Sequence, residues 1–520
     1  MQTDVLIIGS GGAGLTSALH AHKNGATVKI ITKEYPTRAQ TSMAQGGINA
    51  VLDTTNDSIE SHIKNTLHSA HGIADEKAIN FLCSEAPEAV KWLDSLGVCF
   101  SRTKNSTIAQ RTLGGASAPR ACYAQDYTGL KILHTLYDKV VQTDIEILNE
   151  RYLLEILTHN NSVNGAKVLN IRTGEIESYS AKSIIIATGG YSRIYDKHTT
   201  NSTASTGDGI ALAFEAGARV SDMEFIQFHP TALKNSSILI SESARGAGGY
   251  ILNSKGERFT DELLPRDEVA RAIHKEIAKG EDIFLDIRHL GEKFIDEELP
   301  QERKLAKLYE NIDPVHQLIP IKPVAHYTMG GIEVDHNSQT KVKGLFAVGE
   351  CANHKVHGAN RLGGNSLLEL IVFGKQTGQN SAKYAKNIIH QIAIKSSQKR
   401  VKLNTTPTID FYKIREELGE IFYKNVSILR EKKILQLTLQ KVENFIKDIP
   451  SMGIADNSQI YNTNRIEFLE FKNMLLLSRL VLIGAIAREE SRGAHFRVDA
   501  PEEKESFLKQ IIIDKEGVIK

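Results

Sequence analysis

The sequence has few cysteines, and they are not spaced as metal ligands. Cys83, Cys99, Cys122 and Cys351 are the only four in 520 residues, and no two of them form a Cys-x-x-Cys pair. This spacing argues against a disulfide framework, a zinc ribbon or an iron–sulfur cluster built within the chain. It fits a protein of a reducing compartment.

The sequence also lacks long apolar runs and an excess of charge of one sign. No uninterrupted hydrophobic stretch is long enough to cross a bilayer, and the N-terminus enters a strand-like run without a charged leader. The 63 Lys and Arg residues nearly balance the 62 Asp and Glu residues, which gives no argument for binding nucleic acid. We expect a cytoplasmic protein, or one held on the cytoplasmic face of the inner membrane only through partner subunits.

The chain opens with the pattern of a dinucleotide-binding fold: a short apolar run, the glycine-rich GSGGAG, a helix-like segment and a second strand-like run. Gly9, Gly11 and Gly14 match G-x-G-x-x-G, whose glycines allow a tight turn, backbone approach to a pyrophosphate and close helix packing. The acidic ribose ligand usual at the end of the second strand is missing, because Thr32 and Lys33 stand there.

Further glycine-rich turns follow later in the chain. They are AQGG at 44–47, TGG at 188–190 and TGDG at 206–209. Several such turns approaching one extended ligand favour FAD over a nicotinamide dinucleotide, which needs a single fingerprint.

The wide separation of these turns predicts a discontinuous domain. We predict an α/β fold with a Rossmann-like FAD-binding domain of residues 1–224 and 326–395 and an inserted α+β capping domain of residues 225–325. A charged helical pattern then predicts a C-terminal helical domain of residues 405–490, followed by a C-terminal tail of residues 491–520.

Polar and cationic residues recur on short segments bounded by glycine or proline. They are His229 in QFHPTA, Ser241, Glu242 and Arg245 in SESARGAGG, Arg266 in LLPRDEVAR, His326 in AHYTMGG, and His357 and Arg361 in VHGANRLGG. Each segment alone is explained by a structural loop or a local ion pair. Together they offer several hydrogen-bond donors for carboxylates. They also offer one acid and two arginines that could pass a proton along.

These motifs, in this order, resemble one family. With PTR-x-x-T-x-x-AQGGI and ESRGAHFRVD added, the pattern from about residue 3 to residue 502 resembles the flavoprotein subunit of succinate dehydrogenase and fumarate reductase, with L-aspartate oxidase as a close relative. The resemblance implies FAD-dependent interconversion of fumarate and succinate by hydride transfer between flavin N5 and a substrate carbon. It also implies an iron–sulfur subunit as partner, with a membrane anchor subunit beyond it.

The resemblance also implies roles for individual residues. The dicarboxylate would be held by His229, Ser241, where the family usually has Thr, His326 and Arg361, with His357 on the same turn as Arg361. The proton would come from Arg266, with Glu242 and Arg245 as its relay. FAD would be held by Gly9, Ser10, Gly11, Gly12, Ala13, Gly14, Thr32, Lys33, Gln40, Thr41, Gln45, Gly46, Gly47, Asp208, Glu350, Ser366 and Leu367.

One position departs from the respiratory members of this family. They usually carry a His in R-x-H-T that bonds covalently to the flavin, whereas Gln40 stands in RAQT here. Because Gln cannot form that bond, we predict non-covalent FAD. Since the covalent link normally helps to raise the flavin potential, its loss favours fumarate reduction over succinate oxidation.

Two alternatives remain at this point. L-Aspartate oxidase also binds FAD non-covalently, but it usually has an acidic residue before a Gly-Gly pair, where Leu113 precedes Gly114 and Gly115 in this chain. The RLGGNS segment likewise resembles the fumarate branch. A flavin electron carrier without substrate chemistry is disfavoured because Arg266, Arg361 and both substrate histidines are retained.

Overall fold

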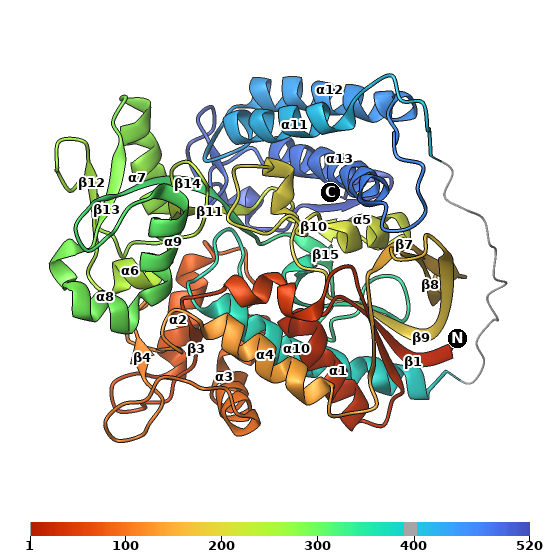
Figure 1. Cartoon of the computed structure of the whole chain (residues 1–520), viewed down its shortest axis with the longest axis horizontal. Coiled ribbons are helices and arrows are strands. Elements are labelled where there is room, and N and C mark those ends of the chain that lie inside the picture. Colours follow the sequence, from red (N-terminus) through yellow and green to blue (C-terminus); the bar gives the residue numbers. More distant parts are fainter. Residues whose placement is uncertain (1, 389–402, 520) are drawn as a thin grey trace.

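The computed structural model describes residues 2–388 and 403–519 of the chain (Figure 1). The expected domain limits at residues 1, 395 and 520 lie outside the described residues. Within the described residues, no helix is both long and apolar enough to cross a membrane.

A seven-stranded sheet forms the centre of the first part of the chain. Its order is β6-β2-β1-β9-β8-β7, with β16 also paired to β9. The strands are β1 (Gln2–Ile8), β2 (Val28–Thr32), β6 (Glu146–Asn149), β7 (Arg151–His159), β8 (Ser162–Asn170), β9 (Ile176–Ile186) and β16 (Leu345–Ala347). Strands β6, β2, β1, β9 and β16 are parallel to one another, whereas β8 pairs antiparallel with β9 and with the edge strand β7. The apolar residues 5–8 of β1 are buried, as expected for a parallel sheet covered on both faces.

Helices from both ends of this part pack together beside the sheet (Figure 1). They are α1 (Gly12–Lys23), α2 (Ile59–Ser69), α3 (Glu76–Leu96), α4 (Thr128–Val140) and α10 (Asn365–Lys386). Helix α1 lies along α10, where Ser17 Oγ donates to the carbonyl of Gly374 at 3.0 Å. The helix that follows the first glycine turn therefore lies beside the helix that follows the VHGANRLGG segment.

A four-stranded antiparallel sheet of order β11-β14-β13-β12 lies to one side of the first sheet (Figure 1). Its strands are β11 (Ile226–Leu233), β12 (Tyr250–Asn253), β13 (Ile283–Asp286) and β14 (Ile319–Thr328). The helices between them are α6 (Glu242–Gly246), α7 (Arg266–Ala278), α8 (Glu292–Glu298) and α9 (Pro300–Glu310). Because β11 and β14 pair, the chain enters and leaves this segment at adjacent strands.

The C-terminal part is helical and then returns to the rest of the chain. Its helices are α11 (Phe411–Asn425), α12 (Lys432–Asp448) and α13 (Thr463–Ala487). After them, β20 (Ile512–Asp514) and β21 (Gly517–Ile519) complete a sheet of order β17-β15-β10-β20-β21 with β10 (Val220–Ser221), β15 (Gly331–Glu333) and β17 (Ala352–Asn353). The remaining elements are α5 (Asp208–Glu215), β3 (Ile48–Asn49), β4 (Gln110–Arg111), β5 (Ala121–Cys122), β18 (Leu429–Arg430) and β19 (Phe496–Arg497).

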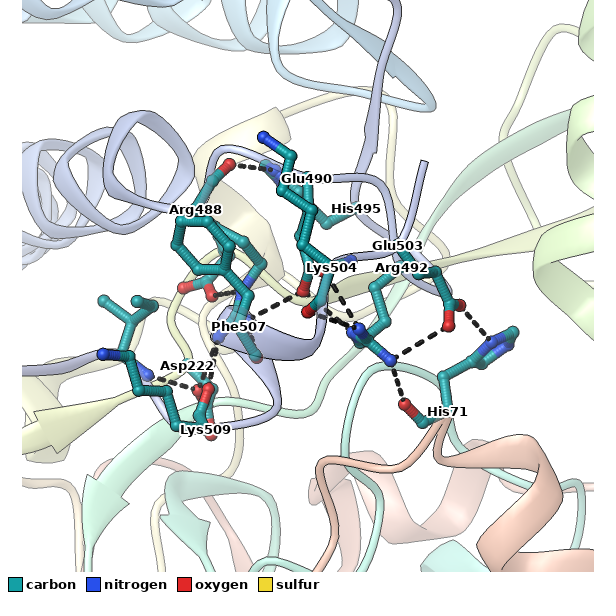
Figure 2. A network of polar contacts seen from close by, with 12 residues as sticks. His71, Asp222, Arg488, Glu490, Arg492, His495, Glu503, Lys504, Phe507 and Lys509 are labelled. Atoms are coloured by element: carbon teal, nitrogen blue, oxygen red, sulfur yellow. Dashed lines mark hydrogen bonds and ion pairs between the residues drawn. The ribbon is translucent and has the colours of Figure 1, made fainter. Parts of the chain in front are cut away.

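A buried ion network fastens the chain after α13 (Figure 2). Arg488 Nε lies 2.6 Å from Glu224, and its other nitrogens lie 3.4 Å from Asp222 and 3.2 Å from Glu490. Arg492 then pairs with Glu490 at 2.8 Å and donates to the backbone carbonyl of the loop at residue 71 at 2.7 Å. The segment expected as a C-terminal tail is thus packed against earlier parts of the chain.

The predicted fold class, an α/β FAD-binding domain with a capping and a C-terminal domain, is confirmed. The residue limits proposed for each domain stay a prediction. The switch from parallel to antiparallel pairing between residues 225 and 325 supports the proposed insertion.

Candidate active site

One long cavity runs from the first glycine turn to the arginines of the four-stranded segment. Nearly all the residues proposed from the sequence line it: Gly9, Ser10, Gly11, Gly12, Ala13, Thr32, Lys33, Gln40, Thr41, Gln45, Gly46, Gly47, Asp208, His229, Ser241, Glu242, Arg266, His326, Glu350, Arg361, Ser366 and Leu367. Residues more than 350 positions apart in the sequence therefore face one space.

The glycine turn after β1 has the geometry that its motif predicts. Gly9 has φ +110°, and a Cβ there would lie 2.2 Å from the carbonyl oxygen of Ala187. A Cβ on Gly14 would lie 2.1 Å from the carbonyl oxygen of Gly9, so a larger residue would push α1 off the strand. By contrast, a Cβ on Gly11 meets nothing closer than 3.4 Å, which leaves its backbone open to a ligand in the cavity.

A charged cluster closes the cavity end next to β2. Lys33 Nζ lies 2.9 Å from Asp208 and 2.5 Å from Glu470 of α13. Although burial alone would lower it, the charges of Asp208 and Glu470 raise the pKa of Lys33 above its usual value, so the lysine is cationic. Asp208 also accepts from Tyr152 at 2.9 Å and from Asn473 at 2.7 Å. The cluster joins β2, β7, α5 and α13 around the proposed nucleotide end.

Two glutamines lie in the middle of the cavity and differ in their partners. Gln40 donates to Asn201 at 3.2 Å and accepts from the N–H of Ser202 at 2.8 Å, so its amide is fixed by the protein. Gln45 is 2% exposed, yet neither its oxygen nor its nitrogen has a hydrogen-bond partner in the described structure. A buried amide without partners is costly, which indicates that a bound molecule satisfies it.

At the other cavity end, Glu242 is the centre of an arginine cluster. Arg266 donates to its Oε2 from Nε at 3.2 Å and from Nη2 at 2.6 Å, and Arg245 reaches its Oε1 at 3.3 Å. The N–H of Gly114 donates to the same Oε1 at 3.2 Å. Burial would raise the pKa of Glu242, but the charges of Arg266 and Arg245 hold it below its usual value, so the carboxylate is ionised.

Arg361 is held at the same end by two contacts. Its Nη2 donates to Oε1 of Gln227 at 3.1 Å, and its Cζ lies 4.2 Å from the ring centre of Tyr327. Tyr327 in turn donates to Glu369 at 2.7 Å. Burial, together with the nearby charge of Arg266, lowers the pKa of Arg361 to about 10, so the side chain stays cationic at neutral pH. Its Nε has no partner in the described structure and is available to an anion.

The two predicted histidines face each other from paired strands. The rings of His229 on β11 and His326 on β14 have centroids 4.8 Å apart. Burial and the neighbouring arginines lower both pKa values well below the usual value, so both rings are neutral at pH 7. His229 Nδ1 accepts from the N–H of Thr231 at 3.2 Å, which leaves the ring proton on Nε2. Neutral rings here act as hydrogen-bond donors.

Ser241 is the N-cap of α6 and lines the cavity beside these groups. Its Oγ accepts from the N–H of Ser243 at 2.9 Å. The backbone N–H of Ser241 donates to Glu302 at 3.0 Å, so the residue is fixed from two sides.

Three proposed residues do not line the cavity. Gly14 instead packs α1 on its strand, and Arg245 lies behind Glu242. The expectation that His357 helps Arg361 to hold an anion is wrong, because its Nε2 points to the carboxylate of Glu369 at 2.9 Å. The two residues share a turn, but only Arg361 lines the cavity.

Other residues at this site were not predicted. Gln227 accepts hydrogen bonds from both Arg266 and Arg361. It could have been predicted from its position two residues before His229 on β11, since residues two apart on a strand point to the same face. Glu470 and Asn473 reach Lys33 and Asp208 from the far end of the chain. Nothing in the sequence singles them out, because the first half of α13 carries several other charged and polar residues.

The comparisons with known proteins agree with this geometry. A family model described as "FAD binding domain" matches residues 4–367, and one described as "Fumarate reductase flavoprotein C-term" matches residues 415–519. The 8-methylmenaquinol:fumarate reductase flavoprotein subunit of Wolinella succinogenes is 39% identical over 98% of this chain and 88% of that protein. The chain belongs to the fumarate reductase and succinate dehydrogenase flavoprotein subunits. It is therefore an FAD-dependent oxidoreductase, and the predicted family is confirmed.

Both branches of this family are represented among the relatives. The succinate dehydrogenase flavoprotein subunit of Rickettsia conorii is 35% identical over 99% of this chain and 94% of that protein. A variant of E. coli quinol fumarate reductase has a TM-score of 0.94 at 34% identity, covering 100% of this chain and 96% of that one. Family membership thus leaves the direction of the reaction to be argued from the site.

Proposed function

We propose that the protein interconverts fumarate and succinate, with fumarate reduction as its main direction. The observation that supports this most directly is the charge at the arginine end of the cavity. Arg245, Arg266 and Arg361 surround the single carboxylate of Glu242, and the nearby histidines are neutral. The arginines outnumber the carboxylate among them, so this end of the cavity favours an anion, and the guanidinium fork matches a carboxylate in shape.

The residues that line the rest of the cavity fit FAD. The open backbone at Gly11 suits the pyrophosphate, the Lys33–Asp208 cluster suits the polar nucleoside end, and the unpartnered amide of Gln45 suits the flavin ring. When bound, FAD supplies a hydride donor or acceptor at N5. Gln40 cannot bond covalently to the ring, and its amide is already held by Asn201 and Ser202, so we propose that FAD is bound non-covalently.

The chain's own residues bind and orient the substrate. Arg361, with a free Nε, grips one carboxylate. The neutral imidazoles of His229 and His326 donate to the carboxylates, and the hydroxyl of Ser241, which donates to Oγ of Ser243 at 2.8 Å in this structure, would turn to do the same. These donors polarise the double bond and hold the reacting carbon in place. Because Arg361 and the two imidazoles are already oriented, no water molecules have to reorient around the developing charge during the reaction.

Arg266 is the proposed proton donor to the substrate carbon. A free guanidinium rarely gives up a proton, but the carbon next to the one that receives hydride becomes strongly basic. Glu242 lies 2.6 Å from Nη2 of Arg266 and 3.3 Å from Arg245, so it can return the proton through the relay. The same contacts orient the guanidinium toward the cavity.

Electrons must be exchanged with a partner, because the sequence has no cluster motif. We propose an iron–sulfur subunit docked on this chain, with a membrane anchor subunit beyond it, by analogy with quinol-linked relatives. The absence of a flavin-linking histidine favours fumarate as the electron acceptor.

The test is anaerobic turnover of the purified protein with reduced viologen and fumarate, beside aerobic peroxide production from L-aspartate. Fumarate-dependent viologen oxidation without peroxide supports the proposal. The buried Leu113 lines the cavity where an acidic partner for a substrate ammonium would stand, so no aspartate oxidation is expected. Robust peroxide from aspartate would instead identify an L-aspartate oxidase, and FAD binding without either activity would identify an electron carrier.

A further inference from the structure

A buried carboxyl pair lies behind Ser241. Glu302 in the first turn of α9 is 0% exposed, and its Oε1 accepts the N–H of Ser241 at 3.0 Å. Asp126, also 0% exposed, precedes α4 in the FAD-binding part of the chain. Its Oδ2 accepts the N–H groups of Gln301 at 2.7 Å and Glu302 at 3.2 Å.

Asp126 is thus the N-terminal cap of a helix in another part of the chain. Helix α9 follows Leu299, which offers no side-chain acceptor, and its first residue is Pro300. Backbone N–H groups at a helix start attract an anion, so Asp126 is the member of the pair that is better stabilised as a carboxylate. A second contact, from Gln125 Nε2 to the carbonyl of Glu297 at 2.8 Å, reinforces the same joint.

One oxygen of each acid remains without a partner. Oε2 of Glu302 and Oδ1 of Asp126 are buried and accept no hydrogen bond in the described structure. Burial and the charge of Asp126 raise the pKa of Glu302 well above its usual value, and burial raises that of Asp126 to about 6. A proton on Glu302 would remove one of two buried negative charges and leave the single charge of Asp126, which the helix start stabilises.

The other charged and polar groups around Glu302 and Asp126 do not neutralise the second negative charge. Arg111 on β4 is the nearby cation, and its charge lowers the pKa of both acids, but its Nε and Nη2 donate to the carbonyls of Gln45, Gly46 and Gln125 rather than to either acid. Its guanidinium also stacks 4.2 Å from the ring centre of Tyr123. The phenol of Tyr127 also lies near both acids and adds no positive charge.

We propose that Glu302 is a positioning residue: it stays protonated beside the ionised Asp126, and in this neutral form it holds Ser241 in place for the dicarboxylate. This inference rests on the proposed function of Ser241. When the proton of Glu302 is lost at high pH, a second buried negative charge appears behind the carboxylate site. That charge repels a dianion and weakens the joint between α9 and the FAD-binding part, so substrate affinity falls while the chemical step is unchanged.

Glu302→Gln tests this proposal, because the amide keeps one acceptor and one donor but cannot ionise. At pH 6.5 we expect a KM for fumarate within about twofold of wild type. Between pH 6.5 and 9 the KM of wild type should rise at least about fivefold more than that of the variant, with kcat unaffected. Glu350 also titrates in the cavity, because burial raises its pKa to about 7. The quantity to compare is therefore the change in KM of wild type minus the change in KM of Glu302→Gln, since Glu350 is present in both proteins.

Glu298→Gln is the matched control, because Glu298 also faces Arg111 but makes no hydrogen bond to Ser241. It should keep the pH profile of wild type. An unchanged pH profile in Glu302→Gln, or a KM that rises equally in both variants, would overturn the proposal.

Hydrogen exchange separates this inference from the proposed function. In substrate-free protein the amides of Ser241, Gln301 and Glu302 should be protected, and Asp126→Ala should speed exchange at Gln301 and Glu302 by about tenfold or more. Unchanged exchange in Asp126→Ala would show that Asp126 does not cap α9. If exchange responds as expected but wild type binds no dicarboxylate, the proposed function fails. The contact of Asp126 with the start of α9 is then still supported.

Discussion

Arg266 and Arg361 donate to the same atom, Oε1 of Gln227, at 3.0 and 3.1 Å. Two guanidiniums repel each other, and a shared neutral acceptor holds them close without cancelling their charge. The amide nitrogen of Gln227 donates to Asn360 at 2.7 Å, which fixes the orientation of the side chain. The proposed proton donor and the proposed carboxylate grip are thus aligned by one residue.

Gln227→Leu removes this shared acceptor and keeps the side-chain volume. Because two charged groups lose a buried hydrogen bond, we expect kcat/KM for fumarate to fall by about tenfold to a thousandfold. Steady-state kinetics with the flavin content measured in parallel gives the result. The exposed Gln317→Leu serves as control and should keep wild-type rates. A Gln227→Leu protein with near-normal kcat/KM would show that the arginines orient themselves.

Arg266→Gln should abolish turnover and retain FAD. The substituted amide cannot deliver a proton to a carbanion-like carbon, and we expect kcat to fall by at least about a thousandfold. Flavin absorbance reports whether the cofactor is still bound. Arg172→Gln removes an exposed arginine that pairs with Glu150, and since neither residue lines the cavity, it should leave the rate unchanged. Substantial activity in Arg266→Gln would remove this residue from the proton-transfer step.

Acid denaturation should release yellow FAD from the protein into solution. Gln40 has no nucleophilic nitrogen for a bond to the ring, and its contacts to Asn201 and Ser202 are lost on unfolding. The absorbance of the supernatant after precipitation measures the released fraction, which should be nearly complete. Flavin that stays with the precipitate would contradict non-covalent binding.

The parts of the site that sequence predicted are those whose chemistry lies within one short motif. The glycines of the first turn are of this kind, because their conformation is determined within the turn. The roles of Arg245, Arg266 and Arg361 were predicted from the resemblance of their motifs to a family, and their directions depend on partners from other segments, such as Gln227. The role of His357 was predicted wrongly because its direction depends on Glu369, which lies on the following helix. Glu470 was missed because its contact with Lys33 depends on where α13 docks, 437 positions away.

The buried Glu350 should make the free energy of unfolding fall as the pH rises. Burial raises its folded-state pKa from 4.5 to about 7, so the folded protein binds this proton more tightly than the unfolded chain. This contribution is present below pH 4.5 and is lost as the pH rises through 7. Relative to Glu350→Gln, which still accepts from Thr328, wild type should lose at most about 3 kcal/mol of unfolding free energy across this window.

Urea denaturation of both proteins at several pH values between 4 and 8 measures this difference. Glu60→Gln on the exposed face of α2 is the control and should follow wild type at every pH. Parallel stability curves for wild type and Glu350→Gln would show that Glu350 titrates alike in the folded and unfolded states.

Arg488 should be among the residues most costly to remove from this protein, although it lies outside the cavity. Its guanidinium is 0% exposed and compensates the buried carboxylates of Asp222, Glu224 and Glu490 (Figure 2). Arg488→Met leaves these charges unpaired, and we expect a loss of about 3–5 kcal/mol in unfolding free energy. Lys91→Met, which breaks an exposed pair with Glu88, should cost less than about 1 kcal/mol. Equal losses in the two variants would mean that the acids around Arg488 take up protons and need no cation.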